Sequence, residues 1–165
     1  MRNLLAASLA VITALPQAPF VPTPADVVDR MLELAEIRPS DVVYDLGCGD
    51  GRIVIAAAQR HGARGVGVDI DPQRIEEARR NAKAAGVAHL VTFRVGDALE
   101  TDVSAATVVT LYLVASLNAR LRPRLMSQLR PGARIVSHNF PIGDWEPERV
   151  DTFRSADGQT RTLFL

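Results

Sequence analysis

Three aspartates that each follow an apolar run are the residues of this 165-residue chain best suited to bind a ligand. Asp45 stands in VVYDLGCGDGR, Asp69 in GVGVDID and Asp97 in RVGDAL. Glycines occupy every second position from Gly47 to Gly51, and glycine lets a backbone pass close to a bound molecule. Because carboxylates attract cations and accept hydrogen bonds, the pattern predicts a ligand with a positive end and several donor groups.

A glycine-rich turn after a strand can bind either a dinucleotide or a positively charged ligand. The two sites differ in the spacing of the glycines that they require. A dinucleotide site requires G-x-G-x-x-G, but Arg52 occupies the position of the third glycine. Asp45 suits a positively charged ligand better than one that carries phosphates. Asp69 can accept from both hydroxyls of a ribose, and Asp97 can accept from an adenine amino group. Together these features describe S-adenosylmethionine (SAM), which we expect as the cofactor.

Apolar runs alternate with helical patterns along the chain, at the spacing of crossover connections. They predict five buried strands and a C-terminal hairpin around Asp157 and Gly158, the strands lying at 42–46, 64–70, 90–95, 107–113 and 133–139. We therefore expect an α/β fold, a doubly wound, mostly parallel, Rossmann-like sheet with a C-terminal antiparallel hairpin. Such sheets bind ligands at the carboxyl ends of their strands, where the three aspartates fall.

Capping residues and prolines predict where the helices begin and end. Thr23 is the expected N-cap of a first helix, and a second helix is expected over residues 52–61. Asp71 is the expected N-cap of a third helix, because a proline follows it at the first helical position. A helical pattern at 116–129 is expected to break or restart at Pro123, which lacks a backbone N–H.

At these spacings the three motifs resemble the class I, seven-strand SAM-dependent methyltransferases, over about residues 20–165. The resemblance implies one cofactor site that also includes the residues next to the second and third aspartates. The implied cofactor-binding residues are Asp45, Gly47, Gly49, Asp69, Ile70, Asp97 and Ala98.

Three further stretches, FVPTP, TLYLVASLNARLRPRL and GARIVSHNFPIGDW, narrow the resemblance. They are similar to a small group of lysine methyltransferases, whose mitochondrial members modify the adenine nucleotide translocase and the ATP synthase c-subunit. Bacterial relatives of that group look the same. The resemblance implies transfer of a methyl group from SAM to a lysine of a protein.

The stretch after the fourth expected strand bears on the methyl acceptor. Methyltransferases that act on DNA bases or glutamine amides usually carry Asp/Asn-Pro-Pro-Tyr/Phe here, whereas this chain has YLVAS from Tyr112 to Ser116. A lysine must be neutral to attack, and its ordinary pKa of about 10.4 leaves roughly one in a thousand neutral at pH 7. An apolar slot lowers such a pKa. TLYLVASL could form one, with Tyr112 as the candidate catalytic residue.

Three functions are compatible with these motifs. The leading one is methylation of a protein lysine, because a chain without an inserted cap domain leaves its acceptor face open to a protein surface. The alternatives are a small-molecule methyltransferase and a non-catalytic SAM-binding module. Asp50 is interpreted as a solvated turn residue, and Trp145 as a lid over the core rather than a wall of the substrate site.

Composition excludes several other classes of site. The formal net charge is zero and the pI is about 6.8, so we expect no nucleic-acid partner. Cys48 is the only cysteine, so no disulfide can form within the chain. No cluster of His, Cys and Asp has the spacing of metal ligands, and we expect no metal.

An apolar segment within residues 1–18 is predicted to stand apart from a methyltransferase domain at 19–165. Its apolar run, Leu4 to Leu15, is shorter than the ~20 residues that span a bilayer and resembles the core of a signal peptide. The segment is interpreted as signal-like or as a membrane tether, with a plain apolar extension as the third alternative. Because SAM is made in the cytosol, we expect the domain on the cytoplasmic side, with or without a tether; the alternative is export by a cleaved signal.

Overall fold

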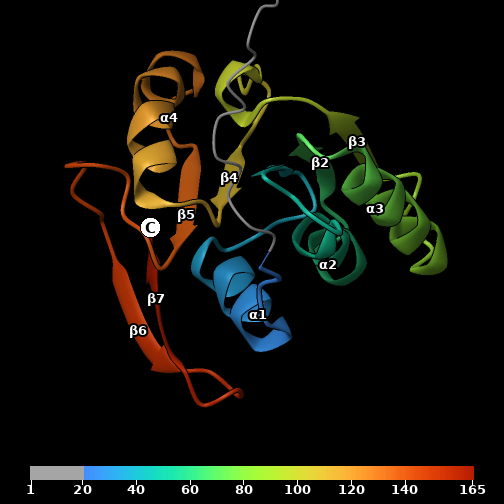
Figure 1. Cartoon of the computed structure of the whole chain (residues 1–165), viewed down its shortest axis with the longest axis horizontal. Coiled ribbons are helices and arrows are strands. Elements are labelled where there is room, and N and C mark those ends of the chain that lie inside the picture. Colours follow the sequence, from blue (N-terminus) through green and yellow to red (C-terminus); the bar gives the residue numbers. More distant parts are fainter. Residues whose placement is uncertain (1–20) are drawn as a thin grey trace, which may run out of the picture.

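Seven strands form a single sheet in the computed structural model, which describes residues 21–165; the predicted apolar segment at 1–18 lies outside them. The strands are β1 (Val42–Leu46), β2 (Arg64–Asp69), β3 (Val91–Val95), β4 (Val108–Leu111), β5 (Arg134–His138), β6 (Val150–Arg154) and β7 (Thr160–Phe164). Their order across the sheet is β3-β2-β1-β4-β5-β7-β6 (Figure 1). β1 to β5 run parallel, and β6 and β7 form an antiparallel hairpin beside β5. The predicted fold class is confirmed.

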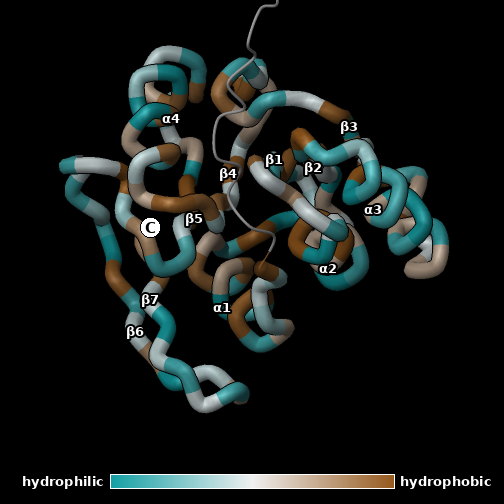
Figure 2. Tube along the Cα trace, in the orientation of Figure 1, coloured by the Kyte–Doolittle hydropathy of each residue, from teal (hydrophilic) through white to brown (hydrophobic). Residues whose placement is uncertain are grey.

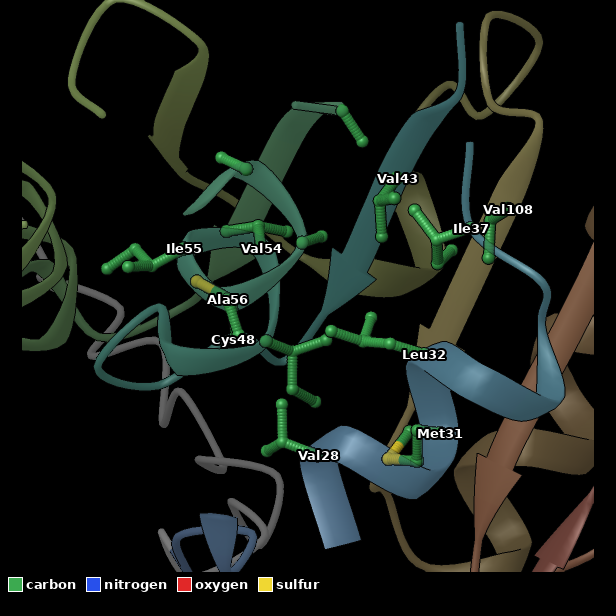
Figure 3. Packing of buried hydrophobic residues seen from close by; sticks show 14 of the residues in the cluster. Val28, Met31, Leu32, Ile37, Val43, Cys48, Val54, Ile55, Ala56 and Val108 are labelled. Carbon is green, nitrogen blue, oxygen red and sulfur yellow. The ribbon is translucent and has the colours of Figure 1, made fainter. Parts of the chain in front are cut away.

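Helices cover both faces of this sheet. The helical elements are α1 (Ala25–Leu34), α2 (Arg52–His61), α3 (Pro72–Ala84), the short 3₁₀ helix η1 (Ala98–Glu100) and α4 (Ala115–Gln128). One core cluster joins α1, α2 and α3 to one face, and the other joins η1 and α4 to the opposite face. Figure 3 shows the first cluster, where Leu32 of α1 and Val54 of α2 pack with Val43 of β1.

The hydropathy of each residue agrees with this layering. Strand β1 is fully apolar on both faces except at Asp45, as expected for a strand covered on both sides. By contrast, β6 at the sheet edge alternates between exposed and half-buried residues. In Figure 2 the outer helix α3 and the tip of the β6–β7 hairpin are mostly teal, because both face solvent.

Local sequence signals placed α2 and α3 correctly. The Asp71 side chain accepts a hydrogen bond from the Gln73 amide at 2.8 Å, as an N-cap does, and Pro72 is the first residue of α3. Helix α2 ends at His61 and is followed by the C-cap Gly62, whose left-handed φ of 67° glycine adopts without strain.

Two predictions about helices were wrong. Thr23 does not cap α1, which begins after Pro24 without a side-chain cap; Asp26 instead accepts hydrogen bonds from Ser155 and the Ala156 amide. Helix α4 runs through Pro123 without a break. Pro123 lies on the exposed side of α4, so water can satisfy the carbonyl that its missing N–H leaves free.

The strand order reverses direction at β1, which pairs with β2 on one side and β4 on the other. At such a switch point the connections leave the sheet in opposite directions and open a crevice at the carboxyl ends of the strands. Across residues 21–165, no helix combines the length and the apolar character needed to cross a bilayer.

Candidate active site

A single cavity of about 840 Å³ opens at the carboxyl ends of β1, β2, β3 and β4. It brings together seven of the eight residues predicted for the site from sequence, namely Asp45, Gly47, Asp69, Ile70, Asp97, Ala98 and Tyr112. The eighth, Gly49, is buried behind the lining, where its amide donates to the Asp69 carboxylate at 2.8 Å. The volume lies within the range of small-molecule and cofactor sites.

A side chain would strain the backbone at two positions of the glycine turn, where φ is positive. Gly47 has a φ of +84°, and a Cβ built on it would stand 2.7 Å from the Leu113 side chain. Gly51 has a φ of +80°, and its Cβ would meet Phe93 and Ala78 at less than 3 Å. Gly47 therefore keeps the turn open to the cavity, whereas Gly51 lets α2 begin tightly against the core.

Asp45 is a nearly completely buried carboxylate at the floor of the cavity. Its side chain accepts a 2.8 Å hydrogen bond from Thr110 on the neighbouring strand β4. Burial, with a smaller contribution from the charges of Asp69 and Asp50, raises the pKa of Asp45 to about 7, although the Thr110 hydrogen bond lowers it. A carboxyl held in this way gains most from a cationic ligand, which would stabilise its charged form.

Asp69 ends β2 and has both carboxylate oxygens tied to backbone groups. One oxygen accepts from the Gly49 amide at 2.8 Å, and the other accepts from the Asp71 amide at 3.0 Å. These bonds fix the orientation of the carboxylate, which lines the cavity, and each oxygen keeps a lone pair for a further donor.

Asp97 follows β3 and is the N-cap of η1. Its side chain accepts from the Leu99 amide at 2.8 Å, so it caps this short helix while remaining exposed at the cavity. Ala98 beside it and Ile70 after β2 add apolar surface to the lining of the cavity. This end of the cavity therefore combines apolar surface with a hydrogen-bond acceptor, which suits a flat, largely apolar group.

The opposite end of the cavity is mostly apolar. Tyr112, Leu113, Val114 and Leu117 line it, from the β4–α4 connection and the first turn of α4, and Arg120 stands at the same end. The Tyr112 ring rests on the buried imidazole of His138, with 3.9 Å between the ring centroids. Trp145 is not among the lining residues; it packs against the α4-side core, which favours a core position.

Sequence reasoning missed one group of residues in the cavity wall. Asp50 was interpreted as a solvated turn residue, but its side chain is only 14% exposed and forms an ion pair with Arg52. Both residues line the cavity, together with the segment Val21–Thr23. Asp50 lies two positions before Arg52 in the chain, a spacing that is compatible with an ion pair. No sequence pattern indicated that Thr23, 29 residues before Arg52, would contact it.

Among residues 21–165 no three His, Cys, Asp or Glu side chains gather as they would around a metal ion. Cys48 is buried in the glycine turn, where burial, followed by the charges of Asp45 and Asp69, raises the pKa of its thiol. A neutral, buried thiol is a poor nucleophile, so Cys48 serves to fill the turn.

Comparison with known proteins identifies the chemistry of this cavity. The sequence model of the family described as "ANTKMT methyltransferase domain" matches residues 45–149. A protein-lysine N-methyltransferase from Saccharolobus islandicus is 47% identical over 152 residues, which cover 91% of this chain and 93% of that protein. The chain belongs to this methyltransferase family. It is a SAM-dependent methyltransferase, and the acid-lined end of its cavity fits that cofactor.

Two further relatives of this methyltransferase show the range of its family. The adenine nucleotide translocase lysine N-methyltransferase of Mus musculus is 35% identical over 134 residues, or 81% of this chain, which spans only 58% of that protein. A crystal structure described as an RNA methyltransferase from Salinibacter ruber, in complex with S-adenosyl-L-homocysteine, is 58% identical with a TM-score of 0.81. The match covers 87% of this chain and 92% of the Salinibacter ruber chain.

Proposed function

We propose that this methyltransferase transfers the methyl group of SAM to the side-chain amine of a lysine in a protein. The observation that carries the proposal is the continuity of the cavity, which runs from the strand-end aspartates to an apolar end at Tyr112. The names of the Saccharolobus islandicus and Mus musculus relatives support a lysine acceptor.

The acid-lined end would hold the cofactor in the order of the strands. Asp45 suits the ammonium of the methionine moiety, Asp69 the ribose hydroxyls and Asp97 the adenine amino group. Ile70 and Ala98 would enclose the adenine between apolar surfaces. Gly47 leaves room for the ligand above the turn, and Gly49 contributes indirectly by orienting Asp69.

The apolar end would prepare the acceptor amine. Bound SAM supplies a methyl group on a sulfonium, which is a good leaving group, so the protein must mainly align the partners. A lysine ammonium loses hydration beside Leu113, Val114 and Leu117, and this loss lowers its pKa toward neutrality. Two hydroxyls line the cavity in this stretch, those of Tyr112 and Ser116, and we assign the orientation of the neutral amine to Tyr112.

RNA is the competing acceptor, because the Salinibacter ruber structure is described as an RNA methyltransferase. The charges of the chain give RNA no overall advantage. The net charge is zero, so a phosphate backbone meets no general attraction. The cavity acids Asp45, Asp69 and Asp97 lie at the cofactor end and do not decide between the acceptors.

Transfer of a labelled methyl group from SAM, followed in a lysate, would distinguish these acceptors. We expect label in protein that is resistant to nuclease, and methylated lysine after acid hydrolysis. Label in RNA would support the competing acceptor, and label only in the small-metabolite fraction would support a small-molecule methyltransferase. A lysate without added enzyme serves as the control for background transfer.

We also propose that the catalytic domain works on the cytoplasmic side of the membrane. The support is chemical: the cofactor is made in the cytosol, so an exported enzyme would lack its methyl donor. The apolar run from Leu4 to Leu15 could act as a tether, and membrane association is part of this proposal.

A further inference from the structure

The segment that enters α1 forms part of the wall of the active-site cavity. Val21, Pro22 and Thr23, here called the arm, all line the cavity, although they lie more than twenty residues before the first predicted site residue. Val21 is exposed, whereas Thr23 is almost fully buried. The arm has no strand or helix of its own, so side chains elsewhere must hold it in place.

Arg52 makes the contact that holds the arm. Its Nη1 donates to the Thr23 carbonyl at 2.8 Å, while its Nε and Nη2 donate to the two carboxylate oxygens of Asp50 at 2.9 and 2.5 Å. One guanidinium thereby ties the arm, the glycine turn and the first residue of α2 together. A planar group with a rigid fork of donors can serve both partners at once, which a lysine ammonium cannot do with the same geometry.

The surroundings of the pair keep it in this arrangement. The Asn81 side chain of α3 donates to the Asp50 carbonyl at 3.0 Å, which anchors the turn from the far side. Hydrogen bonds and the charge of Arg52 outweigh burial and keep the pKa of Asp50 below its usual range. Asp50 therefore stays charged, and Arg52 keeps its ionic partner, across the physiological pH range.

We propose that Arg52 is a positioning residue for cofactor capture: it latches the arm onto the glycine turn so that the arm closes the cofactor end of the cavity. The latch acts through Thr23 and Asp50, and the arm rather than the guanidinium provides the wall. The third-glycine position of a dinucleotide motif thus carries a different function in this chain. The inference concerns SAM binding alone and holds whichever acceptor the enzyme uses.

Binding of SAM and of S-adenosyl-L-homocysteine to the full chain, without any acceptor, tests the latch. Arg52→Met keeps the length of the side chain and removes its donors. We expect its dissociation constant for both ligands to rise about tenfold, as for loss of one charge-assisted hydrogen bond, mainly through faster dissociation. Arg52→Lys should restore part of the affinity, because it keeps the charge beside Asp50 but cannot also hold Thr23.

Arg60→Met is the matched control. Arg60 lies on the same helix and forms an ion pair with Asp29 of α1, but it does not line the cavity. Both methionine variants remove a tie between α2 and the α1 region, so we expect similar small losses of thermal stability. Only Arg52→Met should weaken ligand binding. Equal ligand affinities for Arg52→Met and Arg60→Met would overturn the proposal.

A double-mutant cycle with Pro22→Gly separates the latch from direct contact with the ligand. Pro22→Gly loosens the arm through backbone entropy and should weaken SAM binding by itself. If Arg52 acts through the arm, adding Arg52→Met should cost no more than about twofold further, because the arm is already released. Fully additive losses would show that Arg52 acts independently of the arm and would refute the latch.

Discussion

The ring of Tyr112 lies over the imidazole of His138, with 3.9 Å between the ring centroids and 31° between the ring planes. His138 is completely buried, and neither ring nitrogen has a hydrogen-bond partner among the described residues. Burial, aided by the positive charge of Arg161, lowers the pKa of His138 to about 4. Tyr112 thus rests on a neutral ring at physiological pH, and this support positions it at the apolar end of the cavity.

His138 makes the stability of the fold depend on pH in a defined direction. Its pKa falls from 6.5 in the unfolded chain to about 4 in the folded one, so the unfolded state binds the extra proton between these values. Stability is therefore fully retained above about pH 6.5 and is lost as the pH falls toward 4, by about 3 kcal/mol in all.

The difference in unfolding free energy between the wild type and His138→Phe, measured from pH 4 to 8, isolates this effect. Asp45, whose pKa is raised, contributes a dependence of opposite sign, but it is present in both proteins and cancels. We expect the variant to gain stability relative to the wild type as the pH is lowered. A difference that does not change with pH would contradict the assignment.

Tyr112 should matter for methyl transfer and not for cofactor binding. Tyr112→Phe keeps the ring over His138 and removes the hydroxyl, so SAM affinity should stay within about twofold while single-turnover transfer falls about tenfold. Tyr112→Asp favours the charged ammonium and should lower the rate further. The wild-type rate should rise with pH until the pKa of the bound amine is passed. Full rates in both variants, with a flat pH profile, would exclude the lysine site at Tyr112.

Asp45 should couple cofactor binding to proton release. Its raised pKa of about 7 means that much of the ligand-free protein carries a protonated carboxyl below neutrality, and a cationic ligand needs the charged form. SAM affinity should therefore rise with pH up to about 7. Calorimetry in buffers of different ionisation enthalpy should detect protons released at pH 6. Asp45→Asn should bind SAM about tenfold or more weakly at pH 7.5 and release none.

Asp69 should affect both the cofactor site and the fold, because its two oxygens hold the amides of Gly49 and Asp71. Asp69→Ala leaves both amides without their partner and should lower the unfolding free energy by about 1–3 kcal/mol, besides weakening SAM. Asp69→Asn keeps one acceptor oxygen and should recover part of the stability. Its SAM affinity should remain low, since the charge is lost. Thermal unfolding and calorimetry on the two variants separate these effects.

The cytoplasmic location can be tested with reporters fused after Leu165 in a bacterial host. We expect activity from a reporter that works only in the cytoplasm, and cell fractionation should show whether deleting residues 1–18 releases the protein from membranes. Activity of a reporter that works only outside the cytoplasm would refute the proposal.

Local residue patterns were enough to predict the strands, their mostly parallel arrangement, most of the helix boundaries and the strand-end positions of the site. Apolar runs such as 42–46 must be buried on both faces, and Asp71 caps α3 through a bond to an amide two residues away. Because parallel strands bring their carboxyl ends to one edge, the positions of Asp45, Asp69 and Asp97 in the chain were enough to place them in one cavity.

Contacts between groups far apart in the chain could not be predicted in this way and depend on the folded arrangement of the elements. The Asp26 carboxylate accepts a hydrogen bond from Ser155, 129 residues away, and Arg52 donates to the carbonyl of Thr23, 29 residues before it. The pairing of Tyr112 with His138 depends on β4 and β5 being neighbours and on both side chains facing the same way. Local spacing carries no information on such contacts, because the free energy that selects them comes from burial and hydrogen bonding after the sheet has formed.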